Sequence, residues 1–404
     1  IRDRIPPSPP RKLSIGVTPS TINGMKEIET VIIGAGISGL ACANRLHGKG
    51  REFIIVSKDI GGRMKSSATD PKVGMGGVYI NSDYFNLMPF VDVIEPFRVR
   101  DFYFFDGKSY RTVFSFKNIK YFPKIFRFVV LLWKFRSRLN IMRKGAEEQE
   151  QRVLIENDPL LKKYWYLSAT NFLKQNNFEE LDYLFGQPTA GTNVFATSKD
   201  MNTFYYMYLF LTMIRPAYIV DLSKTAGLLS QEFQSKIIKD EVIKIEKQKT
   251  GKYIVITLKN TFIANNIVIA APYLDITGAY DVPKPAKITS VYTYYVNGRR
   301  KDEYAHKKGI VLHPDSHDAF LLWEQKHGGD LIYAKTADLN LSKYYDNFTI
   351  LDKVFWKTGM HLSSTSIIGQ KLDTGLYLAS DYNFSLMEDA FITGLYAANQ
   401  IIKN

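Results

Sequence analysis

The chain has very few residues that form disulfides or bind metals. Its 404 residues include one cysteine, Cys42, and six histidines. A single cysteine excludes an intramolecular disulfide, so the fold is not expected to depend on an oxidising compartment. His313 and His317 lie four residues apart in HPDSHD, but no Cys, Glu or third His completes a set at the usual metal-ligand spacing. We therefore predict no metal site.

Long apolar runs are also missing. The longest, residues 128–133 and 204–214, are well short of the roughly 20 residues that a membrane-spanning helix needs. Residues 1–24 are polar and proline-rich, without the apolar centre of a secretory signal. We expect residues 1–24 to be a flexible extension or tag, the fold to begin at Met25, and the protein to be cytoplasmic.

Positive charge is abundant and is concentrated in one segment. The formal net charge is +13, and residues 98–144 hold thirteen Lys and Arg against Asp101 and Asp106, with aromatic residues between the charges. This pattern has three interpretations: a solvated basic face over an aromatic core, a surface for anionic membranes, or a nucleic-acid surface. We favour the first, retain a peripheral membrane contact through residues 122–143, and consider nucleic acid the weakest of the three.

A glycine motif stands near the start of the fold. Residues 31–46 read VIIGAGISGLACANRL, a buried-strand run followed at once by Gly34, Gly36 and Gly39 and a small-residue helix. The first glycine makes the turn, the second lets the backbone approach a pyrophosphate, and the third lets the helix pack on the sheet. The free N–H groups of the helix N-terminus favour phosphate. The motif predicts a dinucleotide-binding βαβ unit.

The remaining patterns indicate a discontinuous α/β architecture. A Rossmann-like nucleotide-binding domain would be combined with a second domain of mixed sheet and helices. Expected helices cover residues 38–47, 122–143, 159–175, 204–214, 226–233 and 385–402; expected strands cover 27–33, 53–56, 78–80, 236–238, 242–247, 252–259, 261–270, 288–296 and 376–379.

Four blocks carry a family resemblance. They are VIIGAGISGL…GGRMKS, GMGGVYI, KDEVIKIEKQKTGKYIVITL…NNIVIAAP and GLYLASDYNFSLMEDAFITGLYAA. Over about 380 residues the chain resembles the flavin amine oxidase and phytoene desaturase superfamily, whose first and last blocks together enclose one FAD. The resemblance implies an FAD domain made of residues 25–73, 216–273 and 355–404, and a substrate domain made of 74–215 and 274–354.

The resemblance also implies a set of cofactor-binding residues. The pyrophosphate would lie against the first glycine motif, the phosphates and ribityl chain against the second, and the flavin ring against the GMGG segment and the final helix. Val242 would meet the adenine edge through its backbone, and Asp381 would bond the ribityl or pyrophosphate region; a plain strand residue and a helix cap are the alternatives for these two. The full set is Gly34, Ala35, Gly36, Ser38, Gly39, Ser57, Lys58, Gly61, Gly62, Arg63, Met64, Gly76, Gly77, Val78, Val242, Asp381, Ser385 and Leu386.

The chain departs from the family pattern at three positions. Ser57 stands where an acid normally takes the ribose hydroxyls, and Ser57-Lys58 also suits the 2′-phosphate of NADP. Ser290, with Lys287 three residues away, stands where amine oxidases often place a lysine near flavin N5. Leu386 replaces one wall of their aromatic cage, which is closer to the desaturase branch and to an apolar substrate.

We therefore expect an FAD-dependent oxidoreductase that moves a hydride from an apolar or amine-bearing substrate to flavin N5, with oxygen or a quinone as acceptor. FAD should be non-covalent, because the terminal block holds no Cys or His. Aromatic candidates facing the ring are Tyr79, Trp356 and Tyr382. The alternatives are an FAD-binding scaffold without turnover and an NADP-binding enzyme that uses Ser57-Lys58.

Overall fold

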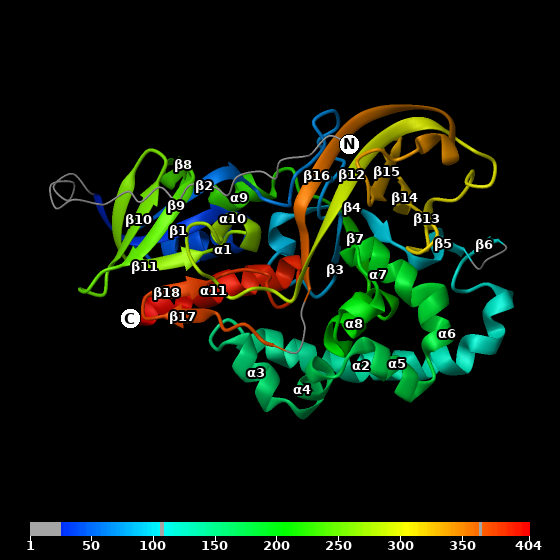
Figure 1. Ribbon diagram of the computed structural model, residues 1–404, viewed down its shortest axis with the longest axis horizontal. Helices are drawn as coiled ribbons and strands as arrows, with labels where there is room; N and C mark the ends of the chain where they lie inside the picture. Colours follow the sequence, from blue (N-terminus) through cyan, green and yellow to red (C-terminus); the bar gives the residue numbers. More distant parts are fainter. Residues whose placement is uncertain (1–25, 106–108, 363–365) are drawn as a thin grey trace, which may run out of the picture.

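The computed structural model describes residues 26–105, 109–362 and 366–404. Within these ranges, every helix is too short or too polar to cross a bilayer. Three sheets and a group of helices make up the fold (Figure 1). The expected extension over residues 1–24 lies outside the described residues.

The largest sheet contains the predicted nucleotide-binding unit. Its eight strands follow the order β17-β18-β11-β1-β2-β8, with β10 beside β11 and β9 beside β10. The parallel centre is formed by β1 (Lys26–Ala35), β2 (Phe53–Ile60), β8 (Ile237–Lys239), β11 (Thr261–Ile269) and β18 (Leu376–Leu378). Antiparallel strands β9 (Val242–Lys247), β10 (Tyr253–Thr257) and β17 (Lys371–Asp373) extend it.

Two helices from opposite ends of the chain pack together on this sheet. They are α1 (Ile37–His47) and α11 (Met387–Lys403). A Cβ on Gly394 would lie 2.1 Å from the carbonyl oxygen of Ser38, so the two helices approach more closely than any side chain would allow. The terminal block is thereby fixed against the first glycine motif.

A second, seven-stranded sheet has the order β16-β12-β15-β14-β13-β5-β6. Its longest strands, β12 (Lys287–Arg300) and β16 (Tyr345–Leu362), pair along their whole length and lead back toward the nucleotide sheet (Figure 1). The others are β5 (Phe102–Phe105), β6 (Tyr110–Arg111), β13 (Gly309–Val311), β14 (Ala319–Glu324) and β15 (Asp330–Ala334). A third, small sheet has the order β3-β7-β4 and is formed by β3 (Tyr79–Asn81), β7 (Ala217–Asp221) and β4 (Asp92–Phe97).

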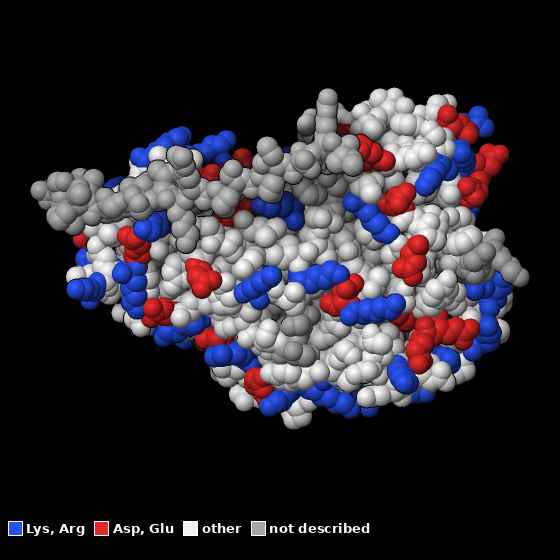
Figure 2. Space-filling view, in the orientation of Figure 1, with Lys and Arg blue, Asp and Glu red and all other residues white. Residues whose placement is uncertain are grey.

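Helices lie below the second sheet in Figure 1. They are α2 (Phe122–Gly145), α3 (Gln151–Asn157), α4 (Pro159–Tyr166), α5 (Ala169–Asn176), α6 (Glu179–Leu181), α7 (Gln187–Val194) and α8 (Thr203–Leu209); α9 (Thr225–Ser230) and α10 (Tyr273–Ile276) belong to the nucleotide side. The inward face of α2 is apolar at helical spacing and is buried through Phe128, Leu132, Phe135 and Leu139. On the face shown in Figure 2, Lys and Arg line much of the lower edge, where α3 and α4 lie.

Most expected elements are confirmed, but three helices are shorter than expected. The helix expected over residues 226–233 is α9, which ends at Ser230. The helix expected over residues 159–175 is divided into α4 and α5, because Ser168 is extended and its side chain caps α5 by accepting a hydrogen bond from the N–H of Asn171. The helix expected over 204–214 ends at Leu209 and continues only as a 3-10 turn. The boundary proposed at residue 355 falls inside β16, and the domain division remains a prediction.

Candidate cofactor and substrate site

The three glycines of the first motif have different surroundings. A Cβ on Gly34, whose φ is +108°, would lie 2.5 Å from the carbonyl oxygen of Ala270, and a Cβ on Gly39 would lie 1.9 Å from that of Gly34. A Cβ on Gly36 would meet nothing within 4 Å. Gly36 is also the N-cap of α1 and provides no side-chain cap, so the first N–H groups of the helix lack that partner. The turn therefore leaves open space at the position where the motif would receive a pyrophosphate.

The second glycine motif lies directly against the first. Gly61 and Gly62 have φ values of +97° and +57°, and a Cβ on Gly62 would lie 3.3 Å from the Cα of Gly36. The next residue reaches the GMGG segment: Gly77 donates its N–H to the carbonyl oxygen of Arg63 at 3.1 Å, and a Cβ on Gly76 would lie 2.1 Å from the same oxygen. Three sequence blocks predicted to hold one cofactor thus meet in space.

An ion pair between half-buried Arg63 and buried Asp381 joins these blocks to the terminal one. Arg63 Nη2 lies 2.5 Å from Asp381 Oδ2, and its Nη1 donates to the carbonyl oxygen of Gly359 at 2.8 Å. The other carboxylate oxygen, Oδ1, lies 2.9 Å from Nδ1 of His361. Burial would raise the pKa of Asp381, but Arg63 and His361 outweigh it and hold the pKa well below its ordinary value. Asp381 is therefore a carboxylate under all ordinary conditions.

His361 is a site residue that the sequence reasoning missed. Its side chain is fully buried at the end of β16, and its backbone N–H donates to Ser385 Oγ at 2.6 Å. Its Nε2 is buried without a hydrogen-bond partner among the described residues. A buried ring nitrogen without a partner, beside a carboxylate predicted to contact FAD, fits a site completed by a bound group.

The residues around the predicted ribose position are engaged with each other. The N–H of Ala35 donates to Ser57 Oγ at 3.1 Å, and the Ser57 hydroxyl donates to the carbonyl oxygen of Asp59 at 2.7 Å. Lys58 Nζ lies 2.7 Å from Glu241 Oε1, and this hydrogen bond raises the pKa of Lys58. A 2′-phosphate would have to compete with Glu241 for Lys58. Val242 follows in β9, where its side chain is buried.

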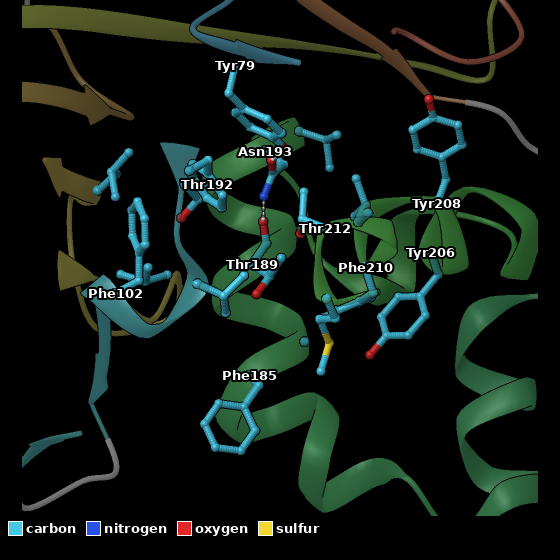
Figure 3. Close-up of a pocket in the computed structure, with 18 of the residues that line it drawn as sticks. Tyr79, Phe102, Phe185, Thr189, Thr192, Asn193, Tyr206, Tyr208, Phe210 and Thr212 are labelled. Carbon is cyan, nitrogen blue, oxygen red and sulfur yellow. Dashed lines mark hydrogen bonds between the residues drawn. The ribbon is translucent and has the colours of Figure 1, made fainter. Parts of the chain in front are cut away.

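A cavity of about 220 Å³ begins where these blocks meet. Gly76, Gly77 and Val78 line one end together with Ser385 and Leu386. The remaining wall is largely aromatic and aliphatic and comes from the second sheet and helices α2, α5, α7 and α8 (Figure 3). Not one Lys, Arg, His, Asp or Glu of the described residues lines it. Such a wall suits an uncharged, apolar ligand.

The polar groups of the cavity are few and partly paired. Tyr79 donates its hydroxyl to Asn193 Oδ1 at 2.5 Å, and Asn193 donates its Nδ2 to the carbonyl oxygen of Thr189 at 2.8 Å, the contact dashed in Figure 3. The Tyr79 ring stacks on Phe97 at 4.9 Å between centroids. Burial raises the pKa of Tyr79 to about 12, so it is a neutral hydrogen-bonding group.

Of the three aromatic candidates, Tyr79 alone lines the cavity among the described residues. Trp356 donates its Nε1 to the carbonyl oxygen of Met75 at 2.8 Å and lies behind Gly76. Tyr382 donates to the carbonyl oxygen of Ala271 at 3.1 Å and packs on the His361 ring. These two are positioned as supports of the site rather than as parts of the cavity wall.

Ser290 does not take the position beside the cavity that the resemblance implied. Ser290 is exposed, and Lys287 is half-exposed and lies 2.5 Å from Asp200. The pairing of β12 with β16 shifts between Thr289 and Val291, and both of these residues are buried. Because side chains alternate between the two faces of a strand, Thr289 and Val291 share the buried face and Ser290 lies on the opposite, exposed face. None of these three residues lines the cavity.

Comparisons with known proteins agree with this arrangement. Residues 32–92 match the model of an NAD(P)-binding Rossmann-like domain. A search of curated protein sequences finds no match. The solved structure of wild-type putrescine oxidase bound to putrescine is 14% identical, with a TM-score of 0.66 over 94% of this chain and 100% of that chain.

Two further solved structures extend the likeness. Cyclohexylamine oxidase from Brevibacterium oxydans is 14% identical, with a TM-score of 0.66 over 93% of this chain and 99% of that one. A CLA-producing fatty acid isomerase from P. acnes is 12% identical, with a TM-score of 0.64 over 93% and 98%. At these identities the likeness shows the fold alone: the chain shares the overall fold of these two oxidases and of the isomerase.

Proposed function

We propose that this protein is an FAD-dependent oxidoreductase of the oxidase or desaturase type that acts on an apolar substrate held in the cavity. One observation carries the proposal: the residues that line the cavity's end, Gly76, Gly77, Ser385 and Leu386, adjoin the Arg63–Asp381 pair. A cofactor lying along the two glycine motifs would therefore reach the cavity wall with its far end.

The residues present fit FAD in several respects. Gly36 leaves open space at the N-terminus of α1, and Arg63 supplies a cation beside the predicted phosphate and ribityl path. An NADP enzyme has less support, because Lys58 is already paired with Glu241. We expect non-covalent binding, since the terminal block has no Cys or His.

The chain's own contribution would be binding, orientation and the exclusion of water. FAD, when bound, would supply an acceptor for the hydride equivalent that the substrate loses. The uncharged wall would place an apolar chain against the cavity's end, and Tyr79 with Asn193 would offer one neutral polar contact. The absence of a carboxylate from the described wall disfavours a cationic amine. Oxygen or a quinone would complete the turnover.

The decisive test compares two substitutions in α1. Gly36→Val should fit the free protein, because a Cβ there meets nothing, but should occupy the space of the pyrophosphate. Gly48→Ala lies at the other end of α1, has φ −62°, and its Cβ would be 3.5 Å from its nearest neighbour. Wild type and Gly48→Ala should purify with a flavin absorption band, whereas Gly36→Val should be folded and colourless.

Three results separate the alternatives. A colourless wild type contradicts the proposal, and one that takes up NADP supports the NADP reading. Flavin that remains attached after acid denaturation contradicts non-covalent binding. Flavin that dithionite reduces while no apolar or amine substrate does so would favour a scaffold without turnover.

A further inference from the structure

One surface of the helical layer combines apolar side chains with basic ones. It consists of the 3-10 helix η4 (Phe116–Tyr121), the residues just before it and the outward side of α2, and is here called the η4–α2 face. Residues 109–146 contain ten Lys and Arg and no Asp or Glu. The exposed large apolar residues of the face are Phe114, Phe116, Ile119, Phe122, Phe126, Val130 and Trp133.

This degree of apolar exposure is unusual for a solvated helix. The side chain of Phe116 is 92% exposed and that of Phe126 is 71% exposed. Along α2 the exposed apolar positions 122, 126, 130 and 133 follow helical spacing and form one stripe, opposite the buried stripe of the same helix. Outward positions of a surface helix are normally polar, so a contiguous exposed apolar stripe indicates a contact with something else.

The charges beside the stripe identify the kind of partner. Lys117, Arg127 and Lys134 are exposed, and none of them forms an ion pair with another described residue. The acids that approach the face, Glu180 and Asp158, are occupied by Lys120 and Lys124 and by Arg138. A helix with apolar residues flanked by free cations suits the headgroup layer of an anionic bilayer, where the apolar side chains enter the acyl boundary and the cations meet phosphate.

The cavity lies directly beneath this face. Val113, Ile125 and Phe128, from the same segment, line the cavity, and Ile125 is itself partly exposed. The cavity and the η4–α2 face are therefore separated by little more than the side chains of one helix. A substrate dissolved in the bilayer would have a short path to an apolar wall without crossing water.

We infer that the η4–α2 face docks on an anionic lipid bilayer and that the substrate enters the cavity from the lipid. Docking follows from the surface alone, whereas the entry of substrate rests on the proposed function. The face lies flat on the membrane, with Phe116 and Phe126 inserted and Lys117 and Lys134 at the phosphates. A second copy of the chain or a nucleic acid covering the same face would be different outcomes of the test.

The test is co-sedimentation of the purified full chain with vesicles of phosphatidylcholine alone or mixed with phosphatidylserine. Binding should require phosphatidylserine and weaken as salt increases. Phe116→Ser/Phe126→Ser and Lys117→Glu/Lys134→Glu should each lower the partition coefficient about tenfold or more. Matched controls remove other exposed apolar groups (Leu258→Ser/Ile350→Ser) or reverse exposed lysines (Lys249→Glu/Lys259→Glu) far from the face, and should bind as wild type does.

Circular dichroism and the flavin band of each variant show that loss of binding is not loss of folding. The inference is overturned if the wild type does not bind phosphatidylserine vesicles, or if the Phe116→Ser/Phe126→Ser variant binds them as the wild type does. So does a wild-type dimer that becomes monomeric in that variant, or DNA or RNA binding without vesicle binding. Vesicle binding by a protein that holds no flavin would leave docking standing and refute the proposed function.

Discussion

At the scale of single residues, the three glycines of one turn differ in what they tolerate. Gly36 faces open space, whereas Gly39 faces the backbone of Gly34 at a distance that no Cβ can occupy. Carbonyl groups of a tight turn cannot move away as the end of a flexible side chain can. We therefore expect Gly36 to be needed for ligand binding and Gly39 for folding, although both positions hold glycine in the same motif.

Gly39→Ala should consequently destabilise the protein itself. The added methyl would lie 1.9 Å from the Gly34 oxygen, and relieving that overlap requires the strand–helix turn to open. We expect a loss of about 3 kcal/mol or more in the free energy of unfolding. Urea denaturation of flavin-free protein measures it, with Gly48→Ala as the control. Equal midpoints for the two variants would show that the turn is not tightly packed.

Glu388 should make stability depend on pH near neutrality. Its carboxylate is 1% exposed and accepts hydrogen bonds from the N–H groups of Asn86 and Leu87. Burial nevertheless dominates and raises the pKa of Glu388 from 4.5 to about 7. The folded protein therefore keeps a proton that the unfolded chain releases, so this contribution is complete below pH 4.5 and is lost as pH rises through about 7. The loss should total about 3 kcal/mol.

Denaturation midpoints between pH 5 and pH 8 test this dependence. Glu388→Gln cannot titrate, so the slope of its unfolding free energy against pH should be smaller by up to about 1.4 kcal/mol per pH unit. The comparison uses slopes, because the substitution also changes the absolute stability. Parallel curves would mean that Glu388 is ionised throughout the range.

At the scale of elements, a buried charge network fixes α2 against α11. Arg143 donates to both oxygens of Asp389, at 3.0 Å and 2.5 Å, and to Asp83 at 3.0 Å. Arg215 pairs with the same Asp83, and Tyr208 accepts a further bond from Arg143. The two helices belong to different domains of the predicted division, so this network holds the two predicted domains together.

Arg143→Met should therefore lower the free energy of unfolding far more than the same change elsewhere on α2. It would leave Asp389 buried without its guanidinium, which typically costs about 3–5 kcal/mol. Arg138 pairs with Asp158 at the surface of the same helix, and Arg138→Met should cost about 1 kcal/mol or less. Thermal unfolding of both variants gives the comparison. Similar losses would show that the network contributes no more than a surface pair.

Elements with strong local signals could be predicted from the sequence, and those set by distant contacts could not. The β1–α1 turn, α2 and α11 follow from glycine spacing and helical periodicity. The placement of Ser290 failed because the face that each residue of β12 presents is set by pairing with β16, about 70 residues later in the chain. His361 was missed for the same reason: only folding brings it beside Asp381, and nothing around it in the sequence marks it.

At the scale of the whole molecule, the predicted cofactor path uses residues from the beginning, middle and end of the chain. Arg63 donates hydrogen bonds to Gly359 and to Asp381, which lies almost 320 residues further along the chain. A ligand that bridges such segments should stabilise the entire fold rather than one part of it. Removal of the ligand should lower the stability of both predicted domains.

Removing the flavin should lower the unfolding temperature in a single transition. Restoring FAD to a hundredfold excess over its Kd should return about 2.7 kcal/mol by mass action. Calorimetry of stripped and reconstituted protein measures the change, and Gly36→Val should not respond to added FAD. Separate transitions for two halves of the molecule would show that the domains are not coupled through the site.

The order of strands in the nucleotide sheet has a consequence during translation. Strand β1 is made first, but its neighbour β11 is synthesised more than 200 residues later, and β18 and α11 follow another hundred residues on. A ribosome must therefore release the chain through α11 before that helix can cover the apolar side of α1. Until then the nascent chain exposes that surface, and we expect its yield in cells to depend on chaperones that bind such intermediates.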